Sequence, residues 1–170
     1  MPNIQKYAVP PDSLLETYSS NGYADCYRTE IHGHISLAQF IAVFYTTSLF
    51  KLERFILTHV ANKPSTDTQA QDLADDKANQ FAAWTVEKRN DHEILMCDML
   101  GRTRSWLMVQ HAKEHSMLYF GSAVVPGKSK SGKSSLGFIF VALLGFHKIY
   151  SILLLSSAKR NIHRSLPTAY

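Results

Sequence analysis

Cysteine is scarce in this chain of 170 residues, where only Cys26 and Cys97 occur. Neither belongs to a CxxC pair, and neither has a histidine at the spacing of a metal site. A disulfide framework is therefore excluded, and we expect two buried thiols in a reducing compartment. The sequence predicts no metal and no cofactor.

A secretory signal and a nucleic-acid-binding stripe are also lacking. Residues 1–18 have neither a basic start nor a continuous apolar stretch, so we expect a cytoplasmic location. The net charge is +4 and the pI is about 9.1, but the positive residues are scattered apart from short clusters within 128–133 and 159–164. Because no recognition motif accompanies these clusters, we expect no nucleic-acid partner.

The composition that is present is that of a globular protein. Hydrophobic residues make up 45% of the chain, aromatic residues 11% and charged residues 19%. A chain of this length suits one core, so we expect an N-terminal arm over residues 1–22 and a single α+β domain over residues 23–165. Within the arm, Asp12 predicts a short helix over residues 12–18 as its cap.

The periodicity of the sequence predicts the order of the elements. Alternation predicts a strand over residues 23–32, and the capping box of Ser36 and Gln39 predicts a helix that breaks at 46–48 and resumes to about residue 61. A short exposed helix follows within 65–79. From Phe81 the period changes to 2, which predicts an antiparallel meander of strands over 81–88, 93–99, 103–110 and 117–125. Residues 136–155 then predict an apolar helix.

Turn chemistry predicts which side chains share a face of this sheet. Gly101 followed by Arg102 suits a two-residue type II′ loop, which sets Cys97 opposite Trp106, and a second turn sets Trp84 opposite Cys97. One face then collects aromatic, sulfur-bearing and aliphatic side chains and one arginine: Trp84, Val86, Leu95, Cys97, Met99, Arg104, Trp106, Met108 and Tyr119. We expect the helix over residues 136–155 to cover this face.

This order of a strand, two helices, a meander and a long C-terminal helix resembles the helix-grip START and Bet v 1-like (SRPBCC) superfamily. The resemblance implies a sheet that curls around the last helix and leaves a cavity for an apolar ligand. It also leaves the N-terminal arm as the place for a further strand. The segments FKLERFIL, FAAWTVE, CDMLGRTRSWL and LYFGSAVVP look like an uncharacterised bacterial protein family, to which we attach no activity.

Three other patterns in the sequence have both a functional and a purely structural interpretation. GKSKSGKS at residues 127–134 matches the Walker A pattern, but it follows an antiparallel meander, and a linker of this composition matches the pattern easily. The helix over 136–155 is long enough to span a membrane, and membrane association through residues 136–164 stays open, although His147 and Lys148 oppose it. Asp98, Arg102 and Arg104 favour pairing across a hairpin, and an inward Arg104 requires an anionic partner such as Glu30, Glu53 or a ligand.

We hypothesise that the chain binds a small apolar or amphipathic ligand between the sheet and the C-terminal helix. The predicted ligand-binding residues are Trp84, Cys97, Arg104, Trp106, Met108, Tyr119 and Phe140, with Arg104 and Tyr119 as polar anchors. One alternative is an enzyme of cyclase or hydrolase type in the same cavity, with Asp98, Glu87 or a histidine as acid or base. A second alternative is a structural or interaction domain without a ligand.

Overall fold

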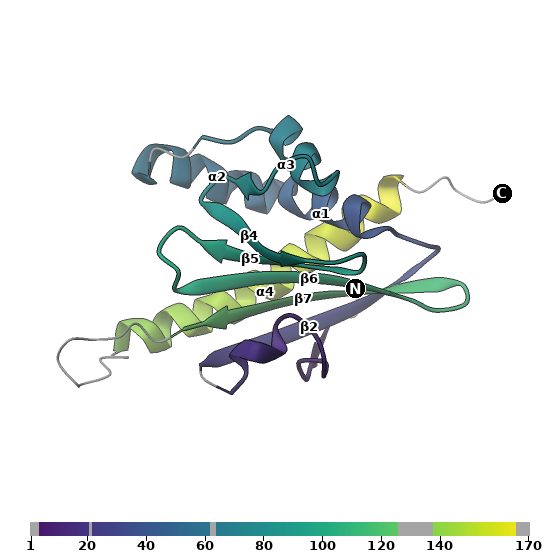
Figure 1. Cartoon of the computed structure of the whole chain (residues 1–170), viewed down its shortest axis with the longest axis horizontal. Helices are drawn as coiled ribbons and strands as arrows, with labels where there is room; N and C mark the ends of the chain where they lie inside the picture. The colour runs from purple at the N-terminus through teal and green to yellow at the C-terminus, as the bar shows by residue number, and fades with distance from the viewer. Residues whose placement is uncertain (1–3, 21, 62–63, 126–137, 166–170) are drawn as a thin grey trace.

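The protein has an α+β fold built on one antiparallel sheet (Figure 1). The computed structural model describes residues 4–20, 22–61, 64–125 and 138–165, and at 56–58, 60–61, 138–148 and 165 it describes the backbone alone. The sheet has seven strands in the order β1-β2-β7-β6-β5-β4-β3. The elements are β1 (Gln5–Tyr7), the 3-10 helix η1 (Glu16–Tyr18), β2 (Tyr23–His32), α1 (Leu37–Tyr45), α2 (Ser48–Ala61), α3 (Asp67–Ala74), β3 (Gln80–Phe81), β4 (Trp84–Arg89), β5 (Glu93–Asp98), β6 (Thr103–His111), β7 (His115–Val124) and α4 (Phe138–Ser165).

The helices and the N-terminal arm lie on opposite faces of the sheet. α4 crosses behind the sheet in Figure 1, whereas the arm around η1 lies in front of it. Leu154, Leu155, Ala158 and Ile162 of α4 are buried in the larger core, together with α1 and the helix-side residues of the strands. A C-terminal helix therefore packs across the sheet, as expected, and the arrangement is compatible with a helix-grip-like fold.

The capping signals in the sequence start and stop the helices as predicted. Ser36 Oγ accepts a hydrogen bond from Gln39 N at 3.1 Å, and Gln39 Oε1 accepts one from Ser36 N at 2.9 Å. The break between α1 and α2 follows from hydroxyl groups: Thr46 Oγ1 donates to Ala42 O at 2.7 Å, and Thr47 Oγ1 accepts from Phe50 N at 3.2 Å. The predicted helix pair and its interruption are confirmed.

The N-terminal arm differs from its prediction. No α-helix forms over residues 12–18, where the structure has turns and the three-residue η1. Asp12 has φ +62°, a left-handed conformation that does not suit a helix cap, and its backbone N–H donates to Glu16 Oε2 at 2.7 Å instead. The arm also supplies β1, which pairs with β2 and provides a further strand of the sheet.

The predicted register of the meander is wrong in both hairpins. Trp84 pairs with Asp98 instead of Cys97, and the register shifts again between Val86 and Lys88, which leaves Glu87 in a bulge. Because a slip of one residue turns a side chain to the other face, Trp84 and Val86 join the helix-side core.

The β5–β6 hairpin has a longer turn than predicted. Residues 99–102 lie outside both strands, and Leu95 pairs with Trp106 instead of Met108, a slip of two residues that leaves every face unchanged. Asp98 decides this turn, because its Oδ1 accepts from Arg102 N at 2.7 Å and from Thr103 N at 3.1 Å. Gly101 does have the predicted positive φ, at +68°.

No helix in the described ranges is both long and apolar enough to cross a membrane. The GKSKSGKS segment at residues 127–134 lies outside those ranges, as does the side chain of Phe140.

Candidate functional site

The sheet face that bears Trp106 is covered by the N-terminal arm and not by α4. Trp106 is fully buried in a small core with Leu15, Cys26, Leu95, Tyr119 and Ala123, and Leu14 and Tyr18 of the arm pack against it. Leu15 is the arm residue that closes this core, with 0% of its surface exposed. The prediction that α4 covers this face, and that Trp84 shares it with Trp106, is therefore wrong.

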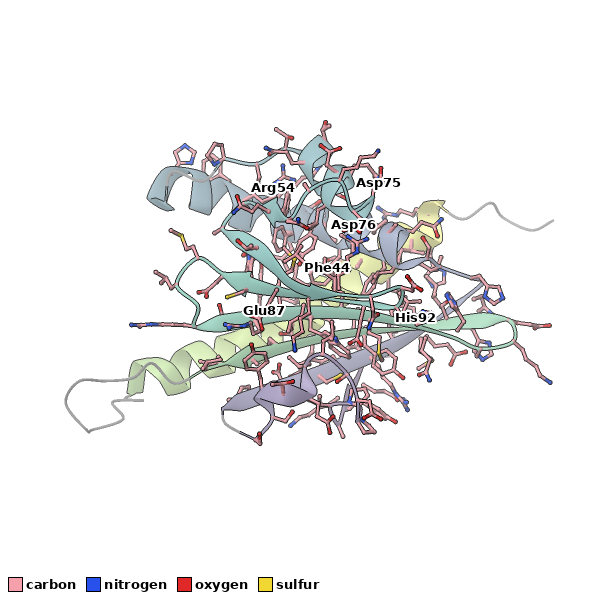
Figure 2. The ribbon with its side chains drawn as sticks, in the orientation of Figure 1. Phe44, Arg54, Asp75, Asp76, Glu87 and His92 are labelled. Atoms are coloured by element: carbon pink, nitrogen blue, oxygen red, sulfur yellow. The ribbon has the colours of Figure 1, made fainter. Side chains whose placement is uncertain are left out.

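On the face that bears Trp106, polar side chains of the sheet form hydrogen bonds and ion pairs that hold the N-terminal arm in place. Glu93 Oε2 accepts from Trp106 Nε1 at 2.6 Å and from the backbone N–H of Leu14 at 2.9 Å. Glu87, labelled in Figure 2, accepts a hydrogen bond from the Tyr18 hydroxyl, and its Oε2 lies 2.5 Å from Arg104 Nε. These contacts join the arm to β4, β5 and β6.

The two predicted polar anchors accordingly have protein partners. Arg104 forms an ion pair with Glu87, although its Nε–H has no aligned acceptor, and its guanidinium lies 4.8 Å from the centre of the Tyr18 ring. The Tyr119 hydroxyl donates to Gln110 Oε1 at 2.9 Å. The anionic partner that an inward Arg104 requires is thus Glu87, on the face away from α4.

The opposite face holds an unexpected series of polar side chains beneath the helices, which we call the polar row. It runs across the helix side of the sheet and then onto the helices, and it consists of Asp25, Ser122, Ser105, Tyr45, Glu53, Tyr150 and Trp84. The antiparallel register sets the first part of this row, because Asp25 pairs with Ser122 and Ser122 pairs with Ser105. α1, α2, α4 and β4 contribute the other four members.

The first end of the polar row is a buried carboxyl group on β2. Asp25 is 3% exposed, and its Oδ1 accepts a hydrogen bond from Ser122 Oγ at 2.5 Å. Its Oδ2 accepts from the Tyr23 hydroxyl at 3.3 Å. Burial, strengthened by the charge of Asp25, raises the pKa of Tyr27 to about 12, which keeps that hydroxyl protonated at neutral pH.

The second end is Glu53, which lies between two aromatic side chains. The Tyr150 hydroxyl donates to Glu53 Oε2, and the Trp84 side chain lies close enough to affect the pKa of the carboxyl group. Burial raises the pKa of Glu53, and the neighbouring Tyr150 and Trp84 side chains oppose the rise. Burial and the neighbouring Glu53 charge raise the pKa of Tyr150 as well. Glu53, Tyr150 and Trp84 are each half-buried, so this end of the row reaches solvent.

Tyr45 lies between the two ends of the polar row, and its hydroxyl group is buried. Its side chain is completely buried among Phe44, Phe50 and Phe81, with the Phe50 ring centre 4.8 Å away. The Tyr45 hydroxyl lies near Ser105, yet in the described part of the chain it has no hydrogen-bond partner of acceptable geometry. A buried hydroxyl without a partner costs about 1–3 kcal/mol, so the core alone does not account for it.

Two shallow hollows on the outer surface are weaker candidates. One, of about 420 Å³, lies between α1, α3 and the end of α4, and the other, of about 470 Å³, lies beside Asp76 and Arg89. Figure 2 labels Asp75 and Asp76, which border these hollows. Arg89 is already used in the fold, because it donates to Leu73 O at 2.6 Å and to Ala74 O at 2.7 Å and so caps α3.

Histidines meet in two pairs at the end of the sheet near the β6–β7 turn. The ring centres of His32 and His115 are 6.3 Å apart, and those of His34 and His111 are 5.5 Å apart. His115 Nδ1 lies 3.7 Å from Glu30 Oε1. Within the described ranges, however, no group of three or more histidine, cysteine, aspartate or glutamate side chains is placed to hold a metal.

Only part of this site was predictable from the sequence. Trp84 was predicted to bind a ligand and does belong to the polar row, but by a different register, and Glu53 was named only as a partner for Arg104. Cys97, Arg104, Trp106, Met108 and Tyr119 lie on or toward the arm side. A signal for the missed residues was present, because Asp25, Ser105 and Ser122 are polar and each is followed two residues later, on the same face, by a larger aromatic or aliphatic side chain.

Comparisons with protein-family models, with curated proteins and with solved structures give no match. The functional assignment therefore rests on the chemistry of the polar row.

Proposed function

We propose that this chain is a small-molecule binding module that takes an amphipathic ligand between the helix side of the sheet and α4. The observation that carries the proposal is the buried Tyr45 hydroxyl, which has no hydrogen-bond partner among the described residues although Ser105 and Glu53 are near enough to affect its pKa. A ligand with a hydrogen-bonding group at this level would satisfy it. Buried polar groups at ligand sites fix orientation in this way, while apolar side chains supply affinity.

The surroundings of the row support the same function. Phe44, Phe50 and Phe81 are buried around Tyr45, so the aliphatic part of a ligand that reaches the Tyr45 hydroxyl would pack against their rings. The half-buried Glu53, Tyr150 and Trp84 give the polar end an approach from solvent. An amphipathic molecule matches this distribution better than a purely apolar one, because the site is apolar at one end and polar at the other.

Native mass spectrometry of the purified protein after exposure to lipid and small-molecule extracts tests the proposal directly. We expect a retained ligand of defined mass. Tryptophan fluorescence gives an independent measure, since Trp84 belongs to the polar row and Trp106 lies on the other face under the arm. The ligand-induced change should persist in Trp106→Phe and disappear in Trp84→Phe. If no ligand is retained and neither tryptophan responds, the proposal is wrong.

A second candidate function is catalysis at the same row, and one observation favours it. A carboxyl group with a raised pKa beside a tyrosine hydroxyl is suited to general acid–base chemistry, and Glu53 beside Tyr150 meets that description. A retained ligand should then be chemically altered on long incubation with the wild type and left intact by Glu53→Gln. If the ligand is recovered with the same unaltered mass from the wild type and from Glu53→Gln, the protein binds the ligand without catalysing a reaction.

A further inference from the structure

The polar row contains two carboxyl groups and no described basic side chain paired with either. Asp25 accepts hydrogen bonds from the hydroxyl groups of Ser122 and Tyr23, and Glu53 accepts one from the hydroxyl group of Tyr150, so these donors are all neutral. Among the described residues, neither carboxyl group takes part in an ion pair. Without a nearby cation, little offsets the free-energy cost of removing a carboxylate from water. This arrangement therefore favours the binding of a positively charged ligand.

Two described basic side chains, one beside Glu53 in the chain and one on α4, have partners outside the polar row. Arg54, which follows Glu53, donates to Asp67 Oδ1 at 2.6 Å and to Ser65 O at 2.6 Å, so it faces α3. Lys159 of α4 donates to Thr29 Oγ1 at 3.0 Å, four residues along β2 from Asp25. These contacts fix both charges away from Glu53.

The hydrogen-bonding capacity of Glu53 narrows the kind of cation. A carboxylate offers about four lone-pair positions, and the Tyr150 hydroxyl occupies one of them. The remaining positions suit a cation that carries N–H groups, because charge-assisted hydrogen bonds are about twice as strong as neutral ones. A quaternary ammonium has no N–H to donate, and it gains only the attraction of charge and of the aromatic faces.

We propose, on the basis of the function proposed above, that the ligand is an amphipathic primary amine whose ammonium group pairs with Glu53. Its alkyl part lies toward the phenylalanine rings around Tyr45. Glu53 is half-buried, so the ammonium group stays nearer to solvent than the alkyl chain does, which limits the cost of desolvating it. The site thereby discriminates by head group among molecules of equal chain length.

The test compares four ligands that share a ten-carbon chain: decylamine, decyltrimethylammonium, decanol and decanoate, each below its micelle concentration at neutral pH. Dissociation constants come from fluorescence titration, with native mass spectrometry as a check on stoichiometry. We expect decylamine to bind about tenfold or more tightly than decanol, and decanoate to bind most weakly. The ratio of decanol to decylamine dissociation constants should fall to about one in Glu53→Gln.

Glu87→Gln is the matched control, since Glu87 undergoes the same chemical change on the arm side of the sheet. It should keep the wild-type preference for the amine. The amine proposal is overturned if wild type binds decanol or decanoate as tightly as decylamine, in which case binding itself stands. A folded Glu53→Gln variant that keeps the preference also overturns it. If none of the four ligands binds, the proposed function fails together with the inference.

Discussion

Leu15→Ala tests whether the N-terminal arm is part of the core of this protein. Leu15 is fully buried against Trp106 although it belongs to no helix or strand. The substitution removes about three carbon groups, each worth about 0.8 kcal/mol when buried, and the remaining cavity adds to the loss. We expect the free energy of unfolding to fall by about 3 kcal/mol, near the lower part of the range for buried leucines, because a surface arm is able to collapse toward the gap.

Urea unfolding followed by tryptophan fluorescence measures this change, and Leu100→Ala is the control. Leu100 is 70% exposed in the β5–β6 turn, so the same truncation there should change stability by no more than about 0.5 kcal/mol. Limited proteolysis should also cut the arm of Leu15→Ala faster than that of the wild type. If Leu15→Ala and Leu100→Ala have equal effects and the arm is equally resistant in both, the arm is not the cover that we describe.

Three further predictions follow from individual contacts. Gly121→Ala should lower the free energy of unfolding by about 1–3 kcal/mol. The reason is steric, because a Cβ at this position would lie 2.9 Å from Asp25 O and 2.9 Å from Trp106 Cε3. An unchanged midpoint of urea unfolding would contradict this prediction. Burial raises the folded-state pKa of Glu53 above its ordinary value, so ionisation of the carboxyl group disfavours the folded state. The stability of Glu53→Gln relative to wild type should therefore increase as the pH rises from below the ordinary carboxyl range through the folded-state pKa. A difference in stability that does not depend on pH would contradict this. Burial raises the pKa of Cys26 to about 12, so a thiol reagent should label the half-buried Cys97 first, and Cys97→Ser should resist labelling until it unfolds.

The sequence determined the kind and order of nearly all the elements. Periods of 3.6 and 2 separate α1 and α2 from the meander, and the Ser36 capping box and the Thr46–Thr47 break set helix boundaries through contacts between residues close in the chain. These signals are local, so they can be read without knowledge of the fold. The long apolar helix was also predicted, although α4 runs to Ser165, beyond the predicted end at residue 155.

The tertiary structure alone decided what covers each face of the sheet. The bulge at Glu87 and the turn set by Asp98 shift the strand register, and a shift of one residue moved Trp84 to the helix side. The closing of the Trp106 face by Leu15 depends on residues far apart in the chain, and no periodicity marks a single leucine in an irregular arm. The polar row likewise exists only after β2, β4, β6, β7 and three helices have come together, because each of its members comes from a different element.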